Sequence, residues 1–203
     1  SSFKANVHSS FRRPTLNDLF WVTGGMSQGL KPEKGKGAEI GYVFKSLSNA
    51  SGRSHRSSSP WWGQSEITLY YRTVDQPILW VPKGTYWFAT NLSGGGKYMG
   101  CQMSGLLKYQ FNKNSSAVLK TNVDRVSSRV KQTPESLAYQ QIFVPDWNGN
   151  VYLGVENGLF ETGLGLDYTG KRFIQTDNLQ FLNSYALLNA QVGLKKWVLP
   201  KGI

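Results

Sequence analysis

Residues 101–124, CQMSGLLKYQFNKNSSAVLKTNVD, decide the expected fold, because side-chain polarity alternates along both halves of the stretch. In the first half, alternate positions from Cys101 to Phe111 are mainly apolar, and most positions between them are polar. The second half repeats the pattern, with apolar residues from Ala117 to Val123. A period of two is that of a β-strand, and the connecting Asn-Lys-Asn-Ser is typical of a tight turn. The stretch therefore predicts an antiparallel hairpin.

The same alternation recurs along most of the chain. It is found at residues 3–11, 39–45, 66–73, 150–156, 160–167 and 186–195. With the hairpin, this predicts about eight strands and no helix. Some connections are short, as at 112–115 and 156–158, whereas others are long, as at 12–37, 80–97, 125–148 and 172–184. Short turns at one end and long loops at the other are typical of barrels that cross an outer membrane.

Composition favours a barrel in a membrane over a soluble β-sandwich, which would also show alternation. Only 17% of residues are charged, whereas 13% are aromatic. The polar faces are mostly uncharged, and several apolar faces finish in aromatic residues, which suit a membrane interface. Examples are Tyr42 with Phe44, Tyr109 with Phe111, and Tyr168. We therefore predict an all-β fold, an antiparallel transmembrane β-barrel.

Several other classes of function are disfavoured. The net charge of +11 is scattered along the chain, and no nucleic-acid-binding motif accompanies it, so no nucleic-acid partner is expected. The carboxylates of the polar faces fall singly on separate strands, and no catalytic set is placed, so an enzyme is not expected. Cys101 is the only cysteine and His8 and His55 are the only histidines, so neither a metal site nor a cofactor is predicted.

Two stretches resemble the motif pair of the TonB-dependent outer-membrane receptors. They are FRRPTLNDLFW at residues 11–21 and GLKPEKGKGAEIGYVF at residues 29–44. Further similar stretches follow in the same order, at 69–87, 91–111, 168–178 and 185–197. The resemblance is nearest to the Bacteroidetes-type receptors for cobalamin and siderophores. The residues that match the motif pair are Arg12, Pro14, Thr15, Leu16, Asn17, Leu30, Lys31, Pro32 and Glu33.

The resemblance implies that residues 1–203 form part of the barrel domain of a receptor in a bacterial outer membrane, in contact with its lipid. The whole barrel would have twenty-odd strands, and the plug domain and TonB-contacting segment would lie outside this sequence. Such a receptor binds a scarce metal chelate, a ferric siderophore or cobalamin, at extracellular loops and imports it with energy delivered by the TonB complex. The alternative is a small stand-alone barrel that acts as a passive pore or an adhesin.

The resemblance makes the long loops extracellular, so their aromatic and basic side chains are the candidate ligand contacts. These candidates are Trp21, Trp80, Tyr86, Trp87 and Arg172. For the tryptophans, the alternative is an aromatic girdle at the upper membrane interface. For Arg12 and Asp18, hydrogen bonds that brace the loop are favoured over contact with a ligand.

Other residues are expected to serve the barrel itself. Trp61 and Trp62 are expected near the opposite membrane interface, at the end of a Ser-rich insertion, residues 47–63, expected to be flexible. Charged residues of the polar faces are expected to form ion pairs or to contact the plug. They are Lys108, Lys120, Asp124, Asp167 and Lys195.

Overall fold

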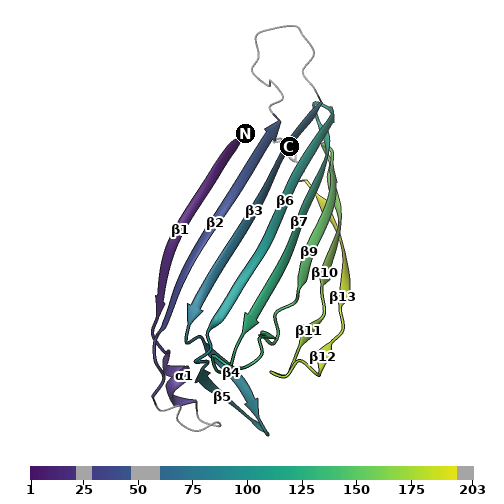
Figure 1. Cartoon of the computed structure of the whole chain (residues 1–203). Coiled ribbons are helices and arrows are strands. Elements are labelled where there is room, and N and C mark those ends of the chain that lie inside the picture. The colour runs from purple at the N-terminus through teal and green to yellow at the C-terminus, as the bar shows by residue number, and fades with distance from the viewer. Residues whose placement is uncertain (22–28, 47–59, 196–203) are drawn as a thin grey trace.

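One curved antiparallel sheet makes up most of the chain. The structure is a computed structural model that describes residues 1–21, 29–46 and 60–195. Eight long strands lie side by side in sequence order (Figure 1). They are β1 (Ser2–Arg12), β2 (Glu33–Ser46), β3 (Trp61–Asp75), β6 (Gly96–Asn112), β7 (Ser115–Val130), β9 (Trp147–Glu156), β10 (Phe160–Thr169) and β13 (Tyr185–Leu194). The prediction of eight antiparallel strands is confirmed.

The two short turns form as their sequences predict. In the turn between β6 and β7, the Asn112 side-chain oxygen accepts a hydrogen bond of 2.9 Å from the Asn114 backbone. Between β9 and β10, the Asn157 side-chain oxygen accepts from the backbone of Leu159 and Phe160, both at 2.8 Å. Asparagine favours such turns because its side chain bonds the backbone two residues on.

The apolar face of the sheet is not covered by a second sheet. Leu69, Leu107, Leu164 and Val192 lie on this face, and their side chains are 50%, 39%, 55% and 79% exposed. A soluble sandwich would bury these residues between two layers, so that alternative is wrong. The buried apolar residues gather instead beneath the long loops, and they include Val74, Ile78, Ala89, Leu92, Val130 and Ile142.

On the opposite, polar face, side chains form ion pairs with side chains two strands away, across the strand between them. Lys4 on β1 bonds Glu66 on β3 at 3.0 Å, across β2. Glu156 on β9 accepts from Lys108 on β6 at 3.2 Å and from Lys195, just beyond β13, at 3.0 Å. Side chains converge in this way on the concave face of a curved sheet. The concave face is therefore polar and the convex face apolar, as in the wall of a membrane barrel.

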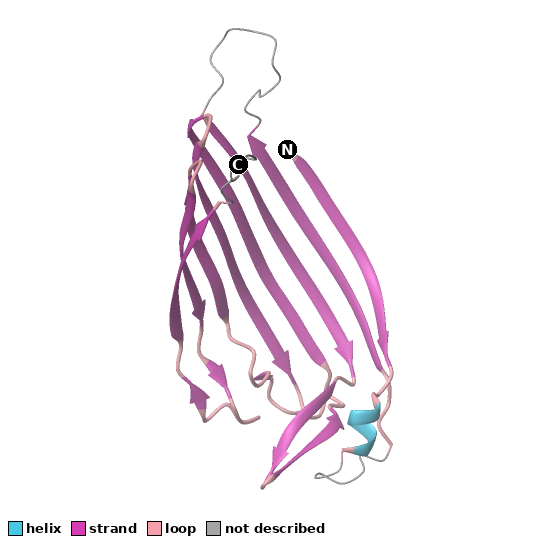
Figure 2. Cartoon of the chain, turned by 180° about the vertical axis from the view of Figure 1, so that it is seen from behind, coloured by secondary structure: helices cyan, strands magenta, loops and turns pink. Residues whose placement is uncertain are grey.

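The sheet forms an open part of a barrel wall. In the described part of the chain, its hydrogen-bonded path ends at β1 and at β13, and these two strands do not pair with each other (Figures 1 and 2). A small barrel closed by eight strands is therefore not what these residues form. No helix among the described residues is long and apolar enough to cross a membrane.

The long connections carry structure of their own. A hairpin of β4 (Ile78–Lys83) and β5 (Tyr86–Asn91) projects from one end of the sheet, beside helix α1 (Leu16–Phe20) (Figure 2). Two further pieces are β8 (Tyr139–Gln140), which pairs with β7, and the pair β11 (Arg172–Phe173) and β12 (Phe181–Leu182). The prediction that the chain has no helix was wrong, because local capping hydrogen bonds stabilise a single short turn.

At the short-turn end, one of the two predicted interface tryptophans, Trp61, lies on the apolar face. Trp61 packs against Tyr109 with ring centroids 4.4 Å apart, and Tyr109 packs edge-on against Phe111 at 5.0 Å. Trp62 is opposite Lys108 in the sheet and so lies on the polar face, which corrects its expected place at the lipid interface. Of the Ser-rich insertion, residues 47–59 lie outside the described residues.

Candidate ligand-binding site

The motif segment that follows β1 folds into a capped helical turn. Thr15 is the N-cap of α1, and its hydroxyl accepts a hydrogen bond of 3.2 Å from the Asp18 backbone. In return, the Asp18 carboxylate accepts from the Thr15 backbone at 2.8 Å. This reciprocal pair is a capping box, which satisfies two backbone donors that a helix start leaves unpaired. It fixes the segment at the point where β1 ends.

Asp18 also joins this helix to the projecting hairpin. Its side chain is 4% exposed, and its Oδ1 accepts a hydrogen bond of 3.0 Å from the indole Nε1 of Trp80. The Arg12 guanidinium lies 3.6 Å from Oδ2. Burial raises the pKa of Asp18. Hydrogen bonds from Thr15 and Trp80 and the charge of Arg12 together lower this pKa by more than burial raises it, so the net pKa is below 3.8. The carboxylate therefore holds three segments together as an anion.

A second junction connects the ends of β1, β2 and β4. Arg12 Nε donates to Glu33 Oε2 at 3.0 Å, and the other Glu33 oxygen accepts from the Ile78 backbone. Arg12 also donates to the Ile78 carbonyl at 3.5 Å. The bracing predicted for Arg12 and Asp18 is therefore present. Three of the motif residues therefore fix the loops through hydrogen bonds: Arg12, Thr15 and Glu33.

Two asparagines that the sequence did not single out dock one loop onto another. The Asn91 side chain accepts from the Lys31 backbone N–H at 2.7 Å and donates to the Lys31 carbonyl at 2.9 Å. Asn178 does the same with Gln140, at 2.6 and 2.9 Å. In both, the side-chain amide pairs with a peptide group as a neighbouring strand would. No periodicity marks such residues, because their partners are distant in sequence.

Four of the five candidate ligand contacts surround one open pocket beside α1 and the β4–β5 hairpin. The pocket has a volume of about 740 Å³, and it is lined by Thr15, Asn17, Asp18, Trp21, Trp80, Thr85, Tyr86 and Trp87. Trp21 meets Trp80 edge-on, with ring centroids 5.5 Å apart. Tyr86 is 57% exposed and Trp87 is 39% exposed, so both rings offer free surface. Such a pocket offers apolar contact area with a few polar groups around it.

Arg172 and all five charged residues predicted for the polar face lie outside this pocket. Arg172 is on β11, with its guanidinium 5.2 Å from the Tyr185 ring, and it does not line the pocket. Lys108 and Lys195 form the predicted ion pairs, both with Glu156. Among the described residues, no ion pair involves the other three. Lys120 lies over the Tyr152 ring, Asp167 accepts from Asn189, and Asp124 is opposite Gln102.

The lowered pKa of Asp18 predicts that acid releases α1 from the hairpin. Because the pKa is lower in the folded loop than in the unfolded one, the ionised carboxylate stabilises the folded loop. That stabilisation is present above about pH 4 and is lost as the pH falls through the folded pKa. We expect the Trp80 indole N–H to exchange faster with solvent below about pH 4. Hydrogen exchange of this indole N–H, followed by NMR, measures the change.

The control for this prediction is Asp18→Asn, which keeps the shape of the side chain but cannot titrate. In this variant, the exchange rate of the Trp80 indole N–H should show only the intrinsic pH dependence of an indole in an unstructured peptide. An identical acid transition in Asp18→Asn would assign the effect to another group.

Comparisons with known proteins agree with this architecture. The family model "TonB dependent receptor-like, beta-barrel" matches residues 1–199. The chain is 30% identical over 108 residues to the vitamin B12 transporter BtuB of Vibrio vulnificus, covering 52% of this chain and 15% of that protein. It is 39% identical over 90 residues to the vitamin B12 transporter BtuB of Photobacterium profundum, covering 44% of this chain and 12% of that protein.

A solved structure gives the same fold. The copper transporter OprC superposes with a TM-score of 0.64 at 13% identity, over 97% of this chain and 29% of that one. The aligned regions span less than a third of each of these relatives, so this chain matches one part of a longer receptor architecture.

Proposed function

This chain belongs to the TonB-dependent receptor β-barrel family, and on that premise we propose that it is part of an outer-membrane receptor that captures a scarce ligand from outside the cell and imports it. The sheet would be one part of a larger barrel wall, with its convex face in the lipid and its concave face toward a plug. Energy for import would come from the TonB complex through a plug domain outside this sequence. The motifs at residues 11–44 favour the Bacteroidetes-type receptors.

One observation carries the binding role: Trp21, Trp80, Tyr86 and Trp87 line a single pocket at the loop end of the wall. Trp80, Tyr86 and Trp87 lie on the projecting β4–β5 hairpin, not on the convex face of a barrel strand. That position favours ligand contact over an aromatic girdle. The hydrogen bonds of Asp18, Glu33 and Asn91 hold the pocket in place, and such preorganisation lowers the cost of binding.

The lining also favours one of the two ligand classes. Among the described side chains of the pocket there is no cation, and its one charged residue, Asp18, is an anion. An anionic ferric siderophore would find no complementary charge here, although the chain as a whole has a net charge of +11. We therefore propose a large and partly apolar metal chelate of the cobalamin class. The similarity to two vitamin B12 transporters supports this choice.

The test uses the complete receptor and cyanocobalamin as the probe. Tyr86→Ala combined with Trp87→Ala should raise the Kd for cyanocobalamin about tenfold or more, because large aromatic contacts carry much of the binding energy. Isothermal titration calorimetry measures the Kd. Phe181→Ala is the matched control, since Phe181 is an exposed aromatic residue of a long loop that does not line the pocket. Its Kd should equal that of the unaltered receptor.

Uptake of labelled cobalamin by cells separates an energised receptor from a passive pore. Import should stop when TonB is deleted or the proton gradient is collapsed. Import that continues under both conditions would favour the pore. If the receptor bound a ferric siderophore and not cyanocobalamin, the proposed role as a receptor would stand, but the proposed cobalamin class of ligand would be wrong.

A further inference from the structure

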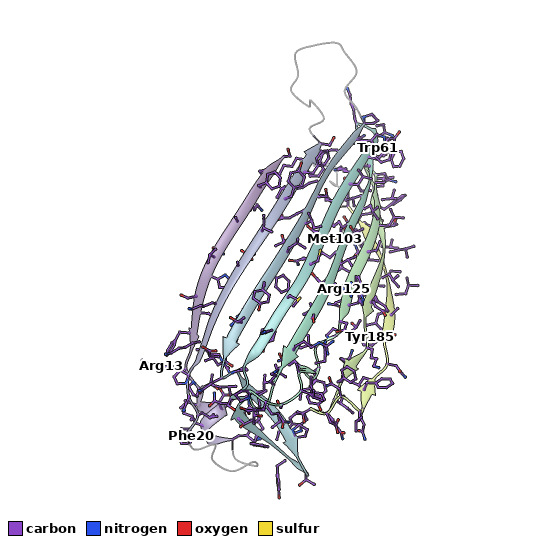
Figure 3. All side chains as sticks on the ribbon, viewed as in Figure 1. Arg13, Phe20, Trp61, Met103, Arg125 and Tyr185 are labelled. Carbon is purple, nitrogen blue, oxygen red and sulfur yellow. The ribbon has the colours of Figure 1, made fainter. Side chains whose placement is uncertain are left out.

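Five basic side chains lie on the convex, apolar face of the sheet near its loop end. We call Lys34, Lys36, Lys97, Arg125 and Arg129 the basic row, and all five are exposed. Alternation places them on this face, since Lys36 is two residues from Ala38 and Lys97 is two residues from Met99. Figure 3 shows Arg125 farther toward the loop end of the sheet than Met103.

Strand pairing brings members of the basic row together. Lys36, Thr73, Lys97 and Arg129 are successive partners across β2, β3, β6 and β7. Lys97 and Arg129 are directly opposite each other, an arrangement of like charges that destabilises a sheet unless an anion compensates it. The carboxylates near the row are Asp75, opposite Lys34, and Asp146, just before β9. The row therefore carries a clear excess of positive charge.

The basic row differs from the cations of the concave face in its lack of partners. On the concave face, Lys4 bonds Glu66, and Lys108 and Lys195 bond Glu156. Within the described residues, the side chains of Lys34, Lys36, Lys97 and Arg129 have no hydrogen-bond or ion-pair partner. Arg125 has only the Trp147 ring, 5.2 Å away. Among the described residues, no carboxylate pairs with the basic row, and an anion from outside the chain would compensate its charge.

The level of the basic row on the wall indicates where that anion lies. Three exposed aromatic residues, Tyr71, Trp147 and Tyr168, end the apolar band of this face at the loop end. Aromatic residues of this kind lie at the level of lipid headgroups. Lys97 is two residues beyond Met99, about 7 Å farther along a strand, and so within the headgroup layer. Phosphates are the anions of that layer.

We propose that the basic row is a binding site for a phosphorylated lipid of the outer leaflet, with its acyl chains against the apolar band and its phosphates between Lys36, Lys97 and Arg129. The inference rests on the proposed placement of the barrel in an outer membrane. A lipid fits better than a free anion, because the cations border a continuous apolar surface that acyl chains cover. The bound lipid removes the repulsion between Lys97 and Arg129.

The experiment measures lipid binding to the complete receptor in detergent by native mass spectrometry. The probes are bis-phosphorylated lipid A and the same lipid without its phosphates. The variant is Lys97→Gln combined with Arg129→Gln, and the matched control is Lys45→Gln combined with Lys113→Gln, two exposed cations at the opposite end of the wall. The first variant should bind phosphorylated lipid at least about tenfold more weakly, whereas the control should bind it as the unaltered receptor does.

Each outcome bears on the proposal. Equal binding of phosphorylated lipid by the unaltered receptor and by Lys97→Gln/Arg129→Gln would overturn it. So would full displacement of the lipid by inorganic phosphate, which would indicate a simple anion site. Cyanocobalamin binding by the same preparations shows that the variants are folded. If the unaltered receptor binds the phosphorylated lipid but not cyanocobalamin, the proposed ligand is wrong and the proposed lipid site is unaffected.

Discussion

Leu153→Arg should lower the free energy of unfolding of the complete receptor in a bilayer by about 2–4 kcal/mol. Leu153 lies on the convex face of β9, 49% exposed, with Leu119 and Leu164 as its partners on the two adjacent strands. In the proposed membrane setting these side chains face hydrocarbon, where a guanidinium loses its water without gaining a partner. Equilibrium unfolding in guanidinium chloride, in phospholipid vesicles and followed by tryptophan fluorescence, measures the change.

A matched control is available on the same strand. Asn150 lies on the concave face, exposed, opposite Asn122 and Asp167. Asn150→Arg introduces the same side chain three residues away, where water and the Asp167 carboxylate can accommodate it. Its effect should stay within about 0.5 kcal/mol, the range of ordinary surface substitutions. If both variants lost the same stability, the two faces would not differ in environment, and the assignment of the convex face to lipid would fail.

The wall could be predicted from sequence because each strand lies between two different environments. That difference appears as a period of two in every strand, from Phe3 in β1 to Leu194 in β13. It does not depend on knowing which strands pair. Neighbours in sequence become neighbours in the sheet, and the short turns specify two of these pairings, β6 with β7 and β9 with β10.

The loops could be predicted only in part, because distant polar contacts hold them. The hydrogen bond between Asp18 and Trp80 joins residues 62 positions apart, and that between Asn91 and Lys31 joins residues 60 apart. Neither pair leaves a periodic pattern. The capping box of α1 is local, but the helix of 5 residues that it caps is too short to show a helical period in the sequence. The sequence marks the aromatic candidates one at a time, and only the fold brings four of them to one pocket and leaves Arg172 outside it.

Glycines on the concave face have a role that residue type alone does not disclose. Tyr152 lies against Gly154 and Gly163, and Tyr70 lies against Gly100 on the adjacent strand. A ring that packs against glycine, without a side chain beneath it, covers exposed backbone. Larger residues at these glycines should therefore disturb the sheet itself.

Gly100→Val should lower the free energy of unfolding of the complete receptor by about 1–3 kcal/mol. A Cβ at Gly100 would overlap the Tyr70 hydroxyl and would lie 2.5 Å from the Arg125 carbonyl oxygen. Adding Tyr70→Ala should restore only part of the loss, because the carbonyl belongs to the backbone of β7 and cannot turn aside. Gly165→Val is the control, since a Cβ there meets its nearest atom, Asn189 Cβ, at an ordinary 3.7 Å. Full recovery in the Gly100→Val/Tyr70→Ala variant would show that the ring alone, not the strand spacing, requires glycine.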